Sequence, residues 1–195
     1  MAVTPMMQQY LEIKNKYKDS ILFYRLGDFY EMFYDDAKVV SKELELTLTG
    51  RSCGEEERAP MCGVPFHSAD TYIGRLVAKG YKVVVCEQME DPAKAKGLVK
   101  RDIVRVVTPG TVIDNTQLVE SQNNYLCAVC FDSGASGIAF VDVSTGEMSA
   151  TSLEGNDMVD RLLNELGIYQ PKEIMVNESL DSFPRIKEYA EQRLH

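Results

Sequence analysis

An aromatic ring and a carboxylate lie two positions apart in the segment Tyr24–Tyr34, whose sequence is Tyr-Arg-Leu-Gly-Asp-Phe-Tyr-Glu-Met-Phe-Tyr. The pair is Phe29 and Glu31. A phenylalanine ring can stack on a nucleic-acid base whatever the identity of that base. A carboxylate can accept a hydrogen bond from a base N–H group, and its protonated form can donate one to a ring nitrogen. These two residue types could therefore contact one base together.

The same two residues also have a structural interpretation, which the local sequence by itself favours. A helix is predicted over residues 30–44, with Asp28 as its N-cap. Glu31 follows Asp28 by three positions, as in a capping box, so its carboxylate could bond to the backbone at the helix start. Phe29 would then be a core aromatic at the beginning of this helix.

Charge is distributed unevenly along the chain. The 195 residues carry a formal net charge of −9, but residues 1–112 hold 16 basic and 16 acidic side chains, and all of the excess acidity lies in residues 113–195. Between positions 94 and 105 one acidic residue, Asp102, is accompanied by five basic residues: Lys94, Lys96, Lys100, Arg101 and Arg105. Such a cluster could contact phosphates. A solvated loop is an equally good interpretation of these residues.

Cysteines and carboxylates elsewhere give weaker indications of chemistry. Five cysteines without a secretory signal favour reduced thiols. Cys127 and Cys130 form a CxxC, but on a strand predicted over residues 125–131 they point to opposite faces, so a metal or redox site is not expected. Asp132 and Asp142 do not form the converging set that a metal-dependent nuclease needs. The chain contains no GxxxxGK[ST] phosphate loop, so we expect it neither to bind nor to hydrolyse ATP. Together with the weak cysteine and carboxylate signals, this leaves no catalytic residue, metal or cofactor expected in the chain.

Helical and extended patterns alternate through the first part of the chain. Helices are predicted from Thr4-Pro5 onward, over residues 30–44 and over residues 68–79, and strands over residues 21–26, 46–49, 81–88 and 102–107. Residues 50–58 are predicted to be a polar loop, and residues 60–65 a segment constrained by two prolines and a glycine. This alternation predicts an α/β domain with a mixed sheet and flanking helices.

A second pattern begins after a polar stretch, so we divide the chain into a domain at 1–112, a linker at 113–124 and a partial domain at 125–195. In the last part three strands are predicted over 125–131, 137–143 and 147–152, followed by a helix over 156–166, a strand over 173–176 and a helical piece from Pro184. No apolar run of about 18 residues occurs, so no membrane helix is expected. The start of the chain has no secretory pattern, and a cytoplasmic location is expected.

Several segments resemble the MutS family of DNA mismatch repair proteins, in matching order and spacing over residues 4–114. The core of the family's mismatch-recognition motif is Phe-x-Glu, which matches Phe29-Tyr30-Glu31. The other similar segments are Thr4–Tyr10, Pro60–His67, Cys86–Met89 and Arg105–Thr111. Residues 125–195 resemble, with weaker motifs, the first part of the family's connector domain, which has an RNase H-like α/β fold.

The resemblance implies that residues 1–112 bind mismatched or unpaired bases in duplex DNA, and it reverses the preference for the structural interpretation. Phe29 would be an aromatic wedge and Glu31 its hydrogen-bonding partner, and the basic cluster would supply phosphate contacts from Lys96, Lys100, Arg101 and Arg105. The chain would be a binding module and not an enzyme.

For the full-length parent, the resemblance implies a C-terminal ATPase that uses ATP and Mg²⁺, a homodimer, and a MutL-type partner. It also implies a bacterial cytoplasmic location in association with the nucleoid. The alternative function is a metal-dependent RNase H-like nuclease.

Overall fold

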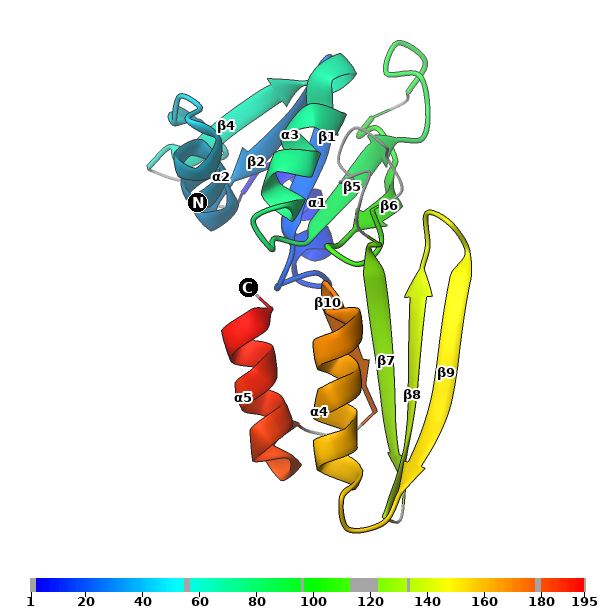
Figure 1. The fold of residues 1–195 in the computed structure, drawn as a ribbon. Helices are drawn as coiled ribbons and strands as arrows, with labels where there is room; N and C mark the ends of the chain where they lie inside the picture. The colour runs from blue at the N-terminus through cyan, green and yellow to red at the C-terminus, as the bar shows by residue number, and fades with distance from the viewer. Residues whose placement is uncertain are drawn as a thin grey trace. The chain divides into compact units, whose positions relative to one another are not determined.

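A computed structural model describes residues 3–54, 57–95, 97–112, 123–132, 134–177 and 180–194 of the chain (Figure 1). The chain forms two compact units, Met1–Val107 and Thr108–His195, and each has its own sheet. Both units combine a sheet with helices, which confirms the mixed α/β class predicted from the sequence. The linker predicted at 113–124 lies outside the described residues except for its last two positions, so the division into 1–112 and 125–195 stays a prediction.

Unit 1 contains a six-stranded sheet with the order β3-β4-β2-β1-β5-β6. Its strands are β1 (Ile21–Leu26), β2 (Phe29–Phe33), β3 (Thr49–Arg51), β4 (Ala59–Pro65), β5 (Val83–Gln88) and β6 (Arg101–Val107). β1 and β5 are parallel, and the other neighbouring pairs are antiparallel. The valine run at the start of β5 is buried, as expected for a strand covered on both faces.

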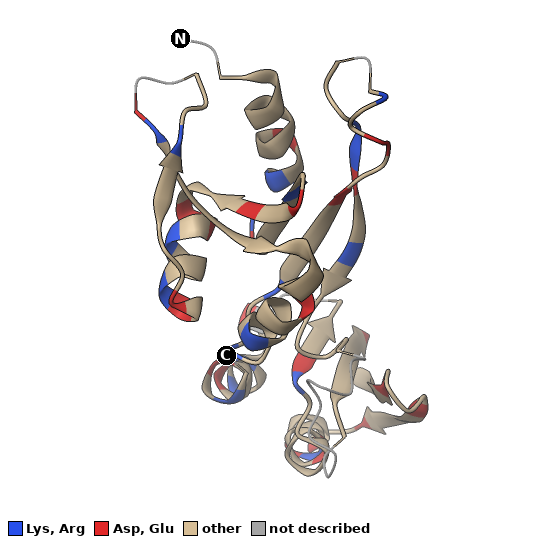
Figure 2. Cartoon of the chain, turned by 90° about the horizontal axis from the view of Figure 1, so that it is seen from above, with Lys and Arg blue, Asp and Glu red and all other residues tan. Residues whose placement is uncertain are grey.

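Helices cover both faces of this sheet: α1 (Pro5–Lys14) lies on one face, and α2 (Tyr34–Leu44) and α3 (Ala69–Val77) lie on the other (Figure 1). Thr4 caps α1, since its hydroxyl oxygen accepts a hydrogen bond from the N–H of Met7, 3.4 Å away, as the Thr-Pro start predicted. The ring of Tyr10, which belongs to α1, packs edge-to-face against the ring of Tyr24 on β1, and the two ring centres are 5.4 Å apart. Basic and acidic residues are interspersed along the elements (Figure 2).

The helix predicted over residues 30–44 is wrong in its first part. Phe29–Phe33 forms β2, and the helix begins only at Tyr34. The reason is that β2 lies between β1 and β4, whose backbones supply hydrogen-bond partners on both sides. Glu31 is therefore in the middle of a strand, and there is no capping box at this helix.

Two predicted segments of unit 1 also take a different form in the structure. The strand expected over 46–49 is instead β3, at Thr49–Arg51, and the constrained segment 60–65 is part of β4. β4 tolerates its prolines because they stand near its two ends, where fewer backbone donors are needed for pairing.

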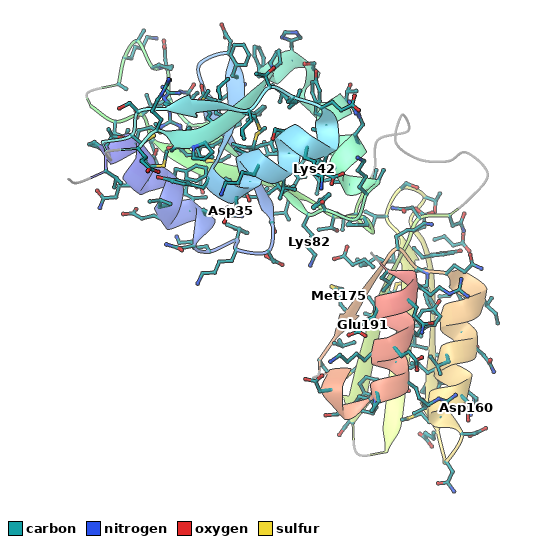
Figure 3. All side chains as sticks on the ribbon, turned by 90° about the vertical axis from the view of Figure 1, so that its left-hand side faces the viewer. Asp35, Lys42, Lys82, Asp160, Met175 and Glu191 are labelled. Carbon is teal, nitrogen blue, oxygen red and sulfur yellow. The ribbon has the colours of Figure 1, made fainter. Side chains whose placement is uncertain are left out.

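Unit 2 has a four-stranded sheet with the order β10-β7-β8-β9. Its elements are β7 (Tyr125–Asp132), β8 (Ala135–Asp142), β9 (Glu147–Glu154), α4 (Met158–Tyr169), β10 (Glu173–Val176), the short 3-10 helix η2 (Leu180–Ser182) and α5 (Pro184–Arg193). The predicted order of three strands, a helix and a further strand is confirmed. The three strands form an antiparallel meander, and β10 is parallel to β7. Helices α4 and α5 cover one face of the sheet, and Met175 of β10, labelled in Figure 3, is 51% exposed on the other.

Candidate nucleic-acid interface

Three connections of unit 1 lie at the same end of its sheet. β4 and β5 run in the same direction as β1, so the carboxyl ends of these strands are together (Figure 1). We call this end the sheet tip and define it as residues 27–29, 65–68, 89–95 and 97–100. The N–H of Phe66, in the 3-10 helix η1 (Phe66–Ser68) that follows β4, donates to the carbonyl oxygen of Asp28 at 2.9 Å. This bond joins the β1–β2 turn to the end of β4.

Phe29 is the first residue of β2 and projects from the sheet tip. It follows the two-residue turn Gly27-Asp28, in which Gly27 takes a φ of +58°, a conformation that costs glycine little. Phe29 pairs with Leu26 on β1 and with Pro65 on β4, yet 46% of it is exposed. It is therefore not a core aromatic, and its ring is available at the tip.

Glu31 lies on the same face of the sheet as Phe29, because residues i and i+2 of a strand point the same way. Its carboxylate forms an ion pair with the guanidinium of Arg51, which comes from the edge strand β3. The residue opposite Glu31 on β4 is Gly63. A Cβ atom built on Gly63 would lie 3.2 Å from the carbonyl oxygen of Tyr30, closer than an ordinary contact, so this glycine allows β4 to approach the backbone of β2 beside Glu31.

A second exposed aromatic, Phe66, belongs to the tip and was missed from the sequence. It is 44% exposed, and the guanidinium carbon of Arg25 lies 3.9 Å from its ring centre. Nε of Arg25 donates to the carbonyl oxygen of Gly27, so one arginine holds both the β1–β2 turn and the second ring. The signal that could have revealed it is an aromatic residue directly after a proline at the end of a strand, where the chain turns at the sheet edge.

The side of the tip that faces α2 and α3 is fixed by partly buried polar contacts. The hydroxyl of Tyr30 donates to Oε1 of Glu87 on β5, and Arg25 lies 3.3 Å from the same oxygen. Burial raises the pKa of Tyr30 to about 12, and the hydrogen bond and charge of Glu87 act in the same direction. Tyr30 therefore stays a protonated donor, and the tip is held in place by contacts within unit 1.

The predicted basic cluster is only partly a surface feature. Lys94 and Lys100 are exposed in the loop between β5 and β6, whereas Lys96 lies outside the described residues. Arg101 is buried, with 9% exposed. Its guanidinium group donates to the carbonyl oxygen of Arg25 at 2.9 Å and to Oε1 of Gln9 at 2.9 Å.

These contacts correct the interpretation of Arg101 as a phosphate contact, because a guanidinium group that bonds to the protein interior is not presented to DNA. Arg105 is exposed, but it forms an ion pair with Asp70 of α3. It pairs with Val85 in the middle of the β5–β6 ladder, away from the sheet tip. The structure thus brings Lys94 and Lys100 to the same end of the sheet as Phe29. Arg101 also lies at this end but is buried, and Arg105 lies away from it.

The described residues contain no group of three or more His, Cys, Asp or Glu side chains that could hold a metal ion. Asp142 is buried, and its Oδ1 accepts hydrogen bonds from the backbone and the hydroxyl of Ser144 at 2.9 and 2.6 Å. It therefore closes the β8–β9 turn. Cys127 is buried and Cys130 exposed, as expected for opposite faces of β7. Among the described residues, no helix is long and apolar enough to cross a membrane.

Comparison with known proteins shows which family the chain resembles. Residues 4–116 match the family model of MutS domain I, and residues 124–194 match that of MutS domain II. The DNA mismatch repair protein MutS of Ruminiclostridium cellulolyticum is 60% identical over 193 residues, which cover 99% of this chain and 22% of that relative. The MutS proteins of Acetivibrio thermocellus (58% identical; 98% of this chain, 22% of the relative) and Caldanaerobacter subterraneus (60% identical; 91% and 20%) are similar too.

The chain therefore belongs to the MutS family. It spans about a fifth of the length of these relatives, and the parts of the family that it matches are the first two domains. The roles of Phe29, Glu31, Lys96, Lys100 and Arg105 in binding stay predictions.

Proposed function

We propose that this chain is the N-terminal part of a DNA mismatch repair protein, in which unit 1 recognises mispaired or unpaired bases in duplex DNA. The observation that carries the proposal is the placement of Phe29 and Glu31. An exposed ring extends from the end of a rigid sheet, and a carboxylate lies two residues further along the same face. The names of the similar proteins support the same function.

The chemistry follows from the weakness of a mismatch. A mispaired step stacks and pairs poorly, so bending the duplex there costs less free energy than bending it elsewhere. An apolar wedge can enter such a step from the minor groove, unstack it and kink the helix. Phe29 would stack on the displaced base, and the Glu31 carboxylate would hydrogen-bond to an edge of that base.

The surroundings of the wedge are suited to a duplex. Phe66 adds a second exposed ring at the tip, and Lys94 and Lys100 place two ammonium groups in the neighbouring loop. Basic side chains contribute phosphate contacts that do not depend on sequence. Unit 1 has few such groups at its tip, so we expect the isolated chain to bind DNA weakly, near the nonspecific range of about 10⁻⁴–10⁻⁶ M.

For the full-length protein we propose the remaining features of a mismatch repair ATPase. They are ATP hydrolysis with Mg²⁺ in a part beyond this chain, homodimerisation, a MutL-type partner, and action on the bacterial nucleoid in the cytoplasm. The family membership and the short span relative to the similar proteins support these proposals.

The test of the function is Phe29→Ala in the full-length protein, measured as the ratio of affinities for a G·T heteroduplex and a matched duplex. Stacking on an aromatic is worth roughly 1–3 kcal/mol, so the preference should fall by about 5- to 150-fold. Leu48→Ala is the matched control, because Leu48 is also 46% exposed and lies outside the sheet tip. An unchanged preference in Phe29→Ala would contradict the proposal, as would an equal loss in the control.

A further inference from the structure

The ion pair between Arg51 and Glu31 joins the sheet edge to the residue expected to contact the base. Nη1 of Arg51 contacts Oε2 of Glu31. The two residues belong to β3 and β2, which are separated by β4. The β4 residues paired with them are small: Ala59 is opposite Arg51 and Gly63 is opposite Glu31. The two long side chains therefore meet across β4, over the face that also carries Met61.

The exposure of the pair indicates which partner is held. The Glu31 side chain is 15% exposed and that of Arg51 is 40% exposed. A mostly covered carboxylate loses hydration, and an adjacent guanidinium replaces part of it with a charge-assisted hydrogen bond. A carboxylate has two oxygens with about four acceptor sites, so a contact with one arginine nitrogen leaves it able to accept a bond from a base.

We propose that Arg51 is a positioning residue for mismatch recognition: it fixes the Glu31 carboxylate on the Phe29 face and offsets its negative charge. This rests on the proposed function of the site. Without Arg51, the glutamate side chain can rotate away from the base, and its uncompensated charge is repelled by the phosphates. The repulsion affects every duplex, whereas the loss of orientation affects only a duplex that presents a displaced base.

The test is a double-mutant cycle in the full-length protein, with the G·T-to-matched affinity ratio as the readout. Phosphate effects cancel in this ratio because they are common to both duplexes. Arg51→Met in the parent should lower the ratio by about 2- to 12-fold, the equivalent of a net hydrogen bond of about 0.5–1.5 kcal/mol. The same substitution in a Glu31→Gln background should leave the ratio unchanged, because the ion pair is already gone.

Two further variants make the cycle decisive. Arg51→Lys keeps the charge and should retain a higher ratio than Arg51→Met. Arg58→Met is the control, since Arg58 is another exposed arginine close to the same edge of the sheet and should leave the ratio unaltered. Thermal unfolding of each variant verifies folding, and Arg51 lies on a short edge strand where its replacement should be tolerated.

The outcomes separate the inference from the function beneath it. If Arg51→Met weakens both duplexes equally in both backgrounds, Arg51 contacts phosphate directly and the positioning role is refuted. An unchanged affinity for both duplexes also refutes it. If the parent shows no G·T preference and Phe29→Ala changes nothing, the proposed function fails and the inference fails with it.

Discussion

Replacing Arg101 by methionine tests whether this arginine stabilises the fold or belongs to the basic surface formed by its neighbours in the sequence. The substitution keeps the length of the side chain and removes its guanidinium group. Three hydrogen bonds are lost, to the carbonyl oxygens of Arg25 and Val99 at 2.9 and 3.1 Å and to Oε1 of Gln9 at 2.9 Å. The cation over the ring of Tyr24, 4.7 Å from the ring centre, is lost as well.

The expected cost follows from these contacts. Each hydrogen bond contributes about 0.5–1.5 kcal/mol net, and a cation over an aromatic ring contributes about 0.5–2 kcal/mol. Neighbouring contacts are not additive, so we expect Arg101→Met to lower the free energy of unfolding of unit 1 by about 2–5 kcal/mol. Lys100→Ala should change it by less than about 0.5 kcal/mol, because Lys100 is exposed.

The assay is urea unfolding of the chain, with hydrogen exchange of the amides in β1, β5 and β6 to report on unit 1 separately from unit 2. DNA binding completes the comparison: Lys100→Ala should weaken binding to matched and mismatched duplexes alike, with a reduced salt dependence. An unfolding free energy for Arg101→Met within about 0.5 kcal/mol of the parent would refute the reasoning. It would mean that the guanidinium group is available to ligands.

Three further predictions concern Glu31, its neighbour and the second unit. Glu31→Gln should tighten binding to matched DNA at low salt by roughly fivefold, because a carboxylate about 4 Å from a phosphate is repelled by about 1 kcal/mol in water; equal affinities of parent and variant at low salt would contradict this. Gly63→Ala should lower both the stability of unit 1 and the G·T preference, because its Cβ would lie 3.2 Å from the backbone carbonyl oxygen of Tyr30 and would force β2 to shift beside Glu31; an unaltered preference in the binding assay would show that the position of β2 at Glu31 does not matter for recognition. In unit 2, burial opposes the ionisation of Asp142, but hydrogen bonds from Ser144, Asn124 and the turn outweigh it and hold the pKa of Asp142 below its ordinary value of 3.8. Because the folded-state pKa is depressed, this carboxylate stabilises unit 2 above pH 3.8, and the stabilisation is lost as the pH falls through the lower folded value. Unfolding of the parent and of Asp142→Asn between pH 2 and 7 should converge at the acid end, and parallel curves would exclude the effect.

Much of the fold was accessible from the sequence because local signals agreed with the final pairing. The Thr4-Pro5 start of α1 was predicted because its capping chemistry is local. The valine run of β5 and the meander of unit 2 were predicted because strand periodicity and turn residues are also local. The likeness of several segments to one family identified Phe29 and Glu31, for which the local pattern alone favoured a core ring and a helix cap.

The tertiary structure decided how those two residues can act. In a helix, residues two apart point to nearly opposite sides, whereas in a strand they share a face. Pairing of β2 with both β1 and β4 selects the strand, and so places the ring and the carboxylate together. The local spacing of Asp28 and Glu31 could not reveal this pairing, because the partner strand β4 lies some 30 positions later in the chain.

The same physics explains the other residues that the sequence alone misplaced or missed. Arg101 lies in a basic segment of the sequence but is buried in the structure, because hydrogen-bond acceptors from α1 and β1 converge on its guanidinium group. Arg51 and Phe66 belong to the site only because β3 pairs alongside β4 and η1 follows the end of β4. Residue type and spacing determined which chemistry this protein could perform. Strand pairing between distant segments decided which side chains face solvent together, because those contacts depend on hydrogen bonds and packing that no local pattern contains.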